Sequence, residues 1–208
     1  MKNLMISSLI LCFAAASAFA QEPERLQTIT IDSEALNQER ILKVYLPPEY
    51  SEEDVYPVIY ITDAGTSNFE AAKSYLDVLT TPIYDAVPKS ILVGISHDDR
   101  NADLDVFQTE SGERFTRHLF NEVLPTIDSL FNTSGFNVMA GHSNGAEFNH
   151  FLFIEEKNPF RGFISMSTNF NTDVRDDVKN ALAAYDGKPM YYFVANGYRD
   201  HPMRIDAG

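Results

Sequence analysis

The chain has 208 residues, of which 16 are Lys or Arg and 30 are Asp or Glu, giving a formal net charge of −14 at pH 7. This length suits one domain with a sizeable core, and no internal repeat or interdomain linker divides the sequence. So acidic a surface repels nucleic acid and anionic lipid, and we therefore expect neither as a partner.

The first twenty residues have the pattern of a secretory signal peptide. Lys2 is followed by an apolar run through Phe13, and Ala18 and Ala20 form an A-x-A pattern at the end of the segment. We expect cleavage after Ala20 and a secreted or periplasmic protein with no stable membrane span in its mature form. A single-span anchor is the alternative, but the apolar run is shorter than the roughly 18 to 20 residues that a bilayer requires.

The strands expected from the sequence are of two kinds. Residues 26–31 and 40–46 alternate apolar and polar side chains, which is typical of an antiparallel pair with one face in water. Later segments are apolar on both faces, which predicts strands in the middle of a parallel sheet. These segments are residues 58–62, 91–95, 137–141, 162–166 and 190–195.

Helical patterns lie between the later strands. Apolar residues at spacings of three and four predict an amphipathic helix over residues 112–131, bent at Pro125. A second helix should run from just after Ser143 to about Lys157, and a third fits residues 173–185. This alternation of strand and helix predicts an α/β protein with a twisted, mostly parallel sheet flanked by helices.

The sequence GHSNG, residues 141–145, carries the main chemical signal. It falls between a predicted buried strand and a predicted helix, the setting of a nucleophile elbow, in which flanking glycines permit a sharp turn. The hydroxyl of Ser143 would then stand at a helix N-terminus, where the N–H of Asn144 can stabilise a developing oxyanion. The alternative is a serine that only caps a helix after a glycine turn.

Seven segments lie in the order found in one hydrolase family: ILKVYLPPEY, YPVIYITDAG, ILVGISHDDRNADL, GERFTRHLFNEVLPTID, VMAGHSNGAEF, PFRGFISMSTNF and MYYFVANGYRD. Through them the chain resembles the "putative esterase" family of the α/β-hydrolase superfamily, which includes enterochelin esterases and S-formylglutathione hydrolases. The resemblance implies an α/β-hydrolase domain over residues 21–208 and a secreted serine esterase that works through an acyl-enzyme. It implies no cofactor, and the sequence has no H-E-x-x-H motif or cysteine cluster for a metal.

Roles carry over from this resemblance position by position. Ser143 takes the place of the nucleophile and Asn144 that of the oxyanion N–H that follows it. The second oxyanion N–H belongs to the loop DAGTSNF, where Gly65 and Thr66 are both candidates. Two aromatic residues on expected loops could wall a pocket, namely Phe69 and Phe170.

The base of the triad is harder to place. In this fold the triad runs in the order serine, acid, histidine, and Asp200 in GYRD matches the acid. The alternative for Asp200 is a turn residue ahead of Pro202. Only His201 follows the acid, and adjacent side chains seldom orient one another toward a third group. We therefore expect the base beyond Gly208, in a C-terminal segment that this chain lacks.

The other histidines fit the role of base poorly. His97 follows a predicted parallel strand at the edge where ligands bind in open α/β folds, so it could line the pocket. We expect His118 at the surface or its boundary, beside the apolar stripe of its helix. His150 lies seven residues beyond Ser143, roughly 10 Å along a helix and out of hydrogen-bond reach.

Three functional hypotheses follow. The first is a serine esterase that acts on a siderophore, sugar or phenolic ester or on a thioester, because the fold does not choose among these substrates. The second is a truncated, inactive remnant or binding protein that lacks the triad histidine. The third is acyl transfer, which uses the same groups and differs only in what attacks the acyl-enzyme.

Overall fold

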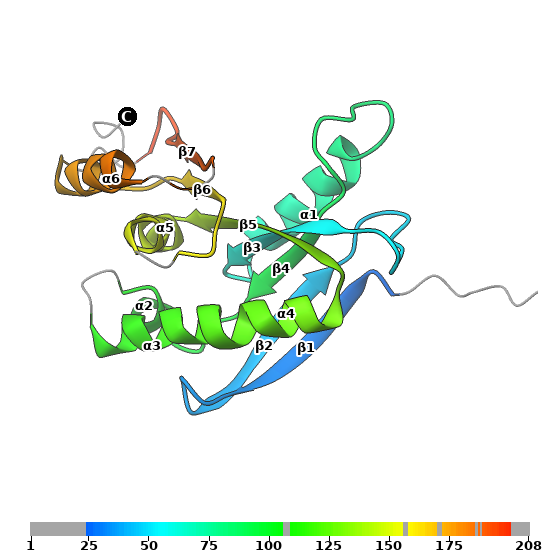
Figure 1. Ribbon diagram of the computed structural model, residues 1–208, viewed down its shortest axis with the longest axis horizontal. Helices are drawn as coiled ribbons and strands as arrows, with labels where there is room; N and C mark the ends of the chain where they lie inside the picture. Colours follow the sequence, from blue (N-terminus) through cyan, green and yellow to red (C-terminus); the bar gives the residue numbers. More distant parts are fainter. Residues whose placement is uncertain are drawn as a thin grey trace, which may run out of the picture.

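One seven-stranded sheet organises the fold (Figure 1). This computed structural model describes residues 24–105, 109–155, 158–169, 172–185, 187 and 189–200. The strands are β1 (Leu26–Ser33), β2 (Gln38–Tyr45), β3 (Tyr56–Thr62), β4 (Ile91–Ile95), β5 (Thr133–His142), β6 (Gly162–Met166) and β7 (Tyr191–Ala195). Their order across the sheet is β1-β2-β4-β3-β5-β6-β7, and only the pairs β1–β2 and β2–β4 are antiparallel. The predicted antiparallel start and mostly parallel sheet are confirmed.

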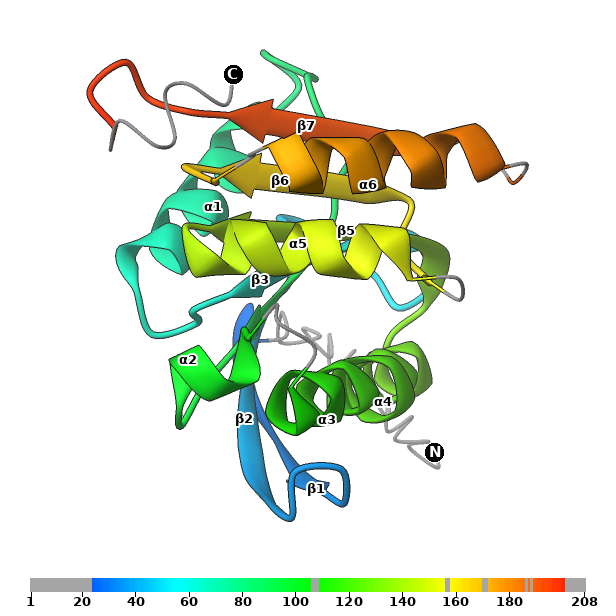
Figure 2. The same ribbon diagram turned by 90° about the vertical axis from the view of Figure 1, so that its left-hand side faces the viewer.

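Helices cover both faces of the sheet. They are α1 (Ser67–Leu79), α2 (Arg100–Asp103), α3 (Glu110–His118), the π-helical turn η1 (Leu119–Val123), α4 (Leu124–Leu130), α5 (Asn144–Ile154) and α6 (Thr172–Ala184). Figure 2 shows α5 and α6 side by side across one face of the sheet, with α1 on the opposite face. The sequence patterns predicted the helices from α3 onward, but they missed α1 and α2.

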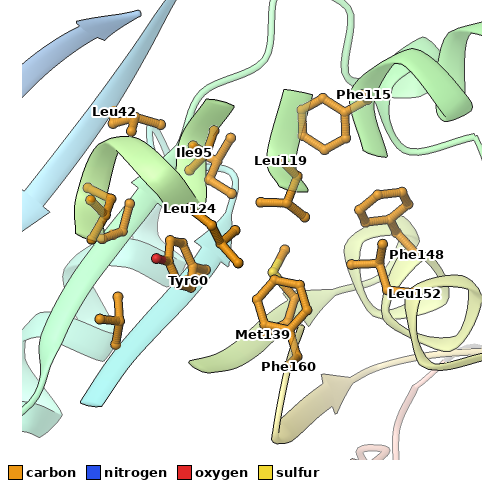
Figure 3. Packing of buried hydrophobic residues seen from close by; sticks show 14 of the residues in the cluster. Leu42, Tyr60, Ile95, Phe115, Leu119, Leu124, Met139, Phe148, Leu152 and Phe160 are labelled. Atoms are coloured by element: carbon orange, nitrogen blue, oxygen red, sulfur yellow. The ribbon is translucent and has the colours of Figure 1, made fainter. Parts of the chain in front are cut away.

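The larger core lies between the sheet and helices α3 to α6. It joins side chains such as Tyr60 of β3 and Met139 of β5 to Leu119 and Phe148 of the helices, all of them fully buried (Figure 3). Alternate residues of the central strands face this core and the smaller one under α1, so both faces of the sheet are apolar. This explains why these strands have no polar face in the sequence.

The helix expected over residues 112–131 is observed as one continuous helical run, α3, η1 and α4, and a π-helical turn lies directly before Pro125. Pro125 stands in the first turn of α4, directly after η1. Because proline has no N–H to donate back along the helix, the regular hydrogen-bond pattern cannot pass through this position. The wider π turn accommodates the interruption.

His118 is not at the surface, contrary to the expectation from its helical position. Its side chain is fully buried, and its Nδ1 lies 2.6 Å from a carboxylate oxygen of Glu122, one helical turn further on. The same carboxylate accepts hydrogen bonds from the Ser33 hydroxyl and the Ala35 N–H of the β1–β2 hairpin. Burial lowers the pKa of His118, so the neutral imidazole is favoured.

Gly94, in the middle of β4, admits α1 to the sheet. A Cβ built at Gly94 would lie 2.6 Å from the ring of Phe69 and 2.9 Å from the Cβ of Ala64. Phe69 is itself fully buried, so its ring has little freedom to move away.

No described helix is long and apolar enough to cross a membrane.

Gly94→Ala is expected to destabilise the protein by about 1–3 kcal/mol, because an added methyl group overpacks the contact with Phe69. Urea denaturation followed by circular dichroism measures the change. Gly197→Ala is the control, since a Cβ there meets nothing within 4 Å, and its effect should stay within about 0.5 kcal/mol. Equal effects of the two substitutions would show that the packing argument is wrong.

Candidate active site

Ser143 forms a strained turn between β5 and α5. Its backbone angles are φ 58° and ψ −123°, outside the helical and strand regions. Its N–H donates to the carbonyl of Met166 at the end of β6 over 3.0 Å, and its own carbonyl accepts from the N–H groups of Ala146 and Glu147. This is the sharp strand, turn and helix geometry expected for GHSNG.

The two glycines of GHSNG are required by close backbone contacts. A Cβ on Gly141 would lie 2.2 Å from the carbonyl oxygen of Gly145, and a Cβ on Gly145 would lie 2.3 Å from the Thr62 hydroxyl. Real Cβ atoms do not approach other atoms so closely. The first turn of α5 therefore sits directly on the ends of β3 and β5, and Ser143 is raised at its N-terminus.

The structure separates the two loop candidates for the oxyanion donor. The Thr66 N–H donates to the Asp63 carbonyl over 2.9 Å, and the Thr66 hydroxyl caps α1. The Gly65 N–H has no acceptor within the part of the chain that the structure describes. Asn144 is the first residue of α5, so its N–H has no acceptor within the helix. Gly65 and Asn144 thus offer the available pair of donors.

Arg100 connects these two donor segments, and sequence reasoning gave it no role. Its guanidinium donates to both carboxylate oxygens of Asp63, with a distance of 2.9 Å from Nη2 to Oδ2. The same Nη2 donates to the His142 carbonyl over 3.2 Å. Asp63 is buried and has a left-handed φ of 67°. The hydrogen bond to this carboxylate raises the pKa of Arg100, so the guanidinium stays charged.

Asp200 lies at the same edge of the sheet as Ser143. It follows β7, two strands from β5, which corresponds to roughly 10 Å between strand axes. The hydroxyl of Ser167 donates to Asp200 Oδ2, and the Asp200 N–H donates to the Gly197 carbonyl over 2.9 Å. Ser167 also has a left-handed φ of 55° and follows β6 directly. Ser167 therefore holds the side chain of Asp200 in place, and sequence reasoning missed this residue.

A buried histidine supports the loops around Asp200. His150 Nε2 lies 2.7 Å from the Thr168 hydroxyl, and its Nδ1 contacts the Tyr192 hydroxyl. The Thr168 N–H in turn donates to the side chain of Asn196 over 2.9 Å. Burial lowers the pKa of His150 to about 4. A neutral His150 thus links α5 to the loops that follow β6 and β7.

His97 is held in the core. Its Nδ1 lies 3.0 Å from Asp103 Oδ2, and Arg40 donates to the other oxygen of the same carboxylate over 3.0 Å. The His97 side chain is 4% exposed, and its ring packs 5.2 Å from that of Phe115. Its expected place as a lining residue of an open pocket is therefore wrong.

Phe69 is likewise not a pocket residue. It belongs to α1 and is fully buried against the sheet, whereas the sequence placed it on a loop. Phe170 and His201 lie outside the described residues.

An apolar cavity of about 320 Å³ opens beside α1, between Asn68 and Tyr75 of the helix and Ile164 and Met166 of β6. Within the described ranges, no three His, Cys, Asp or Glu residues cluster as metal ligands would.

Ser143 lies on a tight turn between a central parallel strand and the N-terminus of a helix. This arrangement is characteristic of the α/β-hydrolases. Residues 33–196 match the family described as "Putative esterase", so the chain belongs to that family. No curated protein sequence matches the chain.

Solved structures share this fold. An IroE-like serine hydrolase from Shewanella oneidensis is 24% identical, with a TM-score of 0.72 over 81% of this chain and 60% of its own. The siderophore hydrolase EstA from Aspergillus nidulans is 14% identical, with a TM-score of 0.66 over 95% and 74%. Enterochelin esterase from Shigella flexneri is 18% identical, with a TM-score of 0.66 over 89% and 48%. The chain thus spans less than two thirds of the first of these proteins.

The lowered pKa of His150 predicts a loss of stability in acid. The unfolded chain takes up a proton near pH 6.5 and the folded chain only near pH 4, so acid favours unfolding between these values. Between pH 7 and pH 5 this one group should lower the free energy of unfolding by about 2 kcal/mol.

Urea denaturation at both pH values checks this prediction, with His150→Gln as the comparison. Glutamine keeps a donor and an acceptor but does not titrate, so the variant should lose markedly less stability over the same interval. His118 has a lowered pKa as well, but it is present in both proteins and cancels. Parallel pH profiles would contradict the assignment.

Proposed function

We propose that this chain carries the nucleophilic site of a secreted serine esterase. The observation that supports the proposal most directly is the conformation of Ser143, with φ 58° and ψ −123° at the N-terminus of α5. A positive φ is energetically unfavourable for serine, and such backbone strain is retained where function requires it. A serine that only capped the helix would accept a hydrogen bond from a nearby N–H, and no such side-chain cap is found at Ser143.

In this proposal, an imidazole takes the proton of the Ser143 hydroxyl as Oγ attacks the ester carbonyl, and it later gives this proton to the departing alcohol. The attack forms a tetrahedral oxyanion. The N–H groups of Asn144 and Gly65 hold the oxyanion, which stabilises it in a site sheltered from water. The intermediate collapses to an acyl-enzyme and releases the alcohol, and water then attacks to release the acid. Acyl transfer to another alcohol would use the same groups.

Asp200 takes the role of the triad acid, after the carboxyl end of β7 and at the same edge of the sheet as Ser143. Its position two strands from β5 leaves room for an imidazole between the acid and the serine. That histidine follows the acid in the order of this fold. His201 is the only histidine after Asp200 in this sequence.

The proposed substrate is a small-molecule ester, with a siderophore ester as the first candidate. Two of the solved structures with this fold are described as a siderophore hydrolase and an enterochelin esterase. Sugar and phenolic esters are the other candidates. The proposal includes export through the signal peptide at residues 1–20, which lie outside the described residues.

A fluorophosphonate probe tests the nucleophile. If Ser143 is activated, its Oγ bonds to the phosphorus and fluoride leaves, and intact-protein mass spectrometry should show one added phosphonyl group. Ser143→Ala should show none. Asp200→Asn should slow labelling by about a hundredfold or more, because a triad acid orients the base.

The wild-type result decides between the first two hypotheses. Labelling at Ser143, with turnover of a 4-nitrophenyl ester, supports an esterase with its base in this chain. A folded chain that is not labelled supports the inactive remnant or binding protein for this 208-residue form. Methyl ferulate, an acetylated sugar and a catecholate siderophore ester then rank the substrate classes by kcat/KM.

A further inference from the structure

The guanidinium of Arg100 bridges two segments that approach the site from different strands. On one side it holds the carboxylate of Asp63, which begins the loop after β3. On the other side it donates to the carbonyl of His142, the last residue of β5. Arg100 itself belongs to α2, which follows β4, so three neighbouring strands meet through one side chain.

These contacts fix the peptide group that immediately precedes Ser143. Its carbonyl oxygen, on His142, accepts from Arg100, and its N–H, on Ser143, donates to the Met166 carbonyl over 3.0 Å. The peptide is thus held from the β3 side and from the β6 side. Its orientation determines where the following Asn144 N–H points.

Asp63 is the corresponding anchor in the loop. It has a left-handed φ of 67°, which is unfavourable for a residue with a side chain, and it is nevertheless buried. The two-point contact from Arg100 holds it there, since a planar guanidinium matches both oxygens of a carboxylate. Gly65 lies two residues further on, so its N–H depends on the same anchor.

We propose that Arg100 is a positioning residue that sets the spacing between the Gly65 N–H and the Asn144 N–H. This inference rests on the proposed esterase function, because it assigns these two groups to the oxyanion. Arg100 contacts neither donor N–H and acts through Asp63 and His142. A displacement of one donor by about 1 Å can cost roughly a hundredfold in rate.

The chain contains a matched control for the loss of such an arginine. Arg25 also bridges a carboxylate and a carbonyl: it lies 2.5 Å from Asp77 and donates to Leu46 over 3.1 Å. The side chains of Arg25 and Arg100 are 34% and 35% exposed. Arg25 lies at the opposite edge of the sheet, where β2 pairs with the beginning of β4. Arg25→Met therefore removes a similar bridge away from the site.

Hydrogen–deuterium exchange tests whether Arg100 holds the two segments in place, and it requires no turnover. Arg100→Met should speed exchange about tenfold in peptides that contain the Thr66 and Ser143 N–H groups, both of which are bonded in the native turns. Arg25→Met should leave these peptides unchanged. Asp63→Asn, which keeps the shape but loses the charge, should resemble Arg100→Met and serves if that variant does not fold. Unchanged exchange in both site variants would overturn the proposal.

Kinetics supply a readout that a purely structural arginine would not affect. With a 4-nitrophenyl ester, Arg100→Met should lower kcat about a hundredfold and leave KM within about threefold, because the oxyanion forms only after binding. The kcat of Arg100→Lys should lie between those of the wild type and Arg100→Met, since lysine keeps the charge but lacks the planar guanidinium group. Arg25→Met should match the wild type. A rise in KM with kcat unchanged would overturn the proposal.

The two proposals fail in different ways. If the wild-type chain is folded but Ser143 takes up no fluorophosphonate, the esterase assignment fails for this chain. Exchange in the peptides that contain Thr66 and Ser143 still tests whether Arg100 positions these segments. If Ser143 is labelled at the same rate in the wild type and in Arg100→Met, the esterase assignment stands and the positioning role is wrong.

Discussion

The contact between the end of β5 and the first turn of α5 is the constraint on which the rest of the site depends. No atom larger than hydrogen fits between Gly141 and the backbone of Gly145, so strand and helix meet backbone to backbone. A chain that must turn this tightly leaves one residue, Ser143, in a left-handed conformation at the helix N-terminus. That conformation directs free N–H groups toward the space above the serine.

Sheet topology then explains why the other groups come from distant parts of the sequence. β3 and β6 flank β5, so the loop after β3 and the residues after β6 are the nearest segments to Ser143. The first brings Gly65, and the second brings Ser167, whose hydroxyl holds Asp200 from β7. All of these strands run parallel, so their carboxyl ends share one edge.

The sequence predicted the features that a local pattern encodes. Strands such as β4 and β6 were placed with their observed bounds because their apolar runs are short and bounded by turns. Helix α1 was missed because only Phe69 is fully buried and small Ala72 occupies the next inward position, although Thr66 gives a recognisable cap. His118 was misplaced because its burial depends on the β1–β2 hairpin, a distant segment that covers Glu122.

Buried polar pairs fix the loops at the edge of the sheet where the site lies. Asp63, Asp103, His150 and Thr168 are all buried in loops or beside them, where an unpaired polar group would be costly. Each has a partner from another element: arginine for the two carboxylates, and tyrosine, threonine or asparagine for the others. Apolar packing cannot orient a loop so specifically, because it has no directional preference. The core therefore holds the strands in place, and these pairs fix the loops that carry the site.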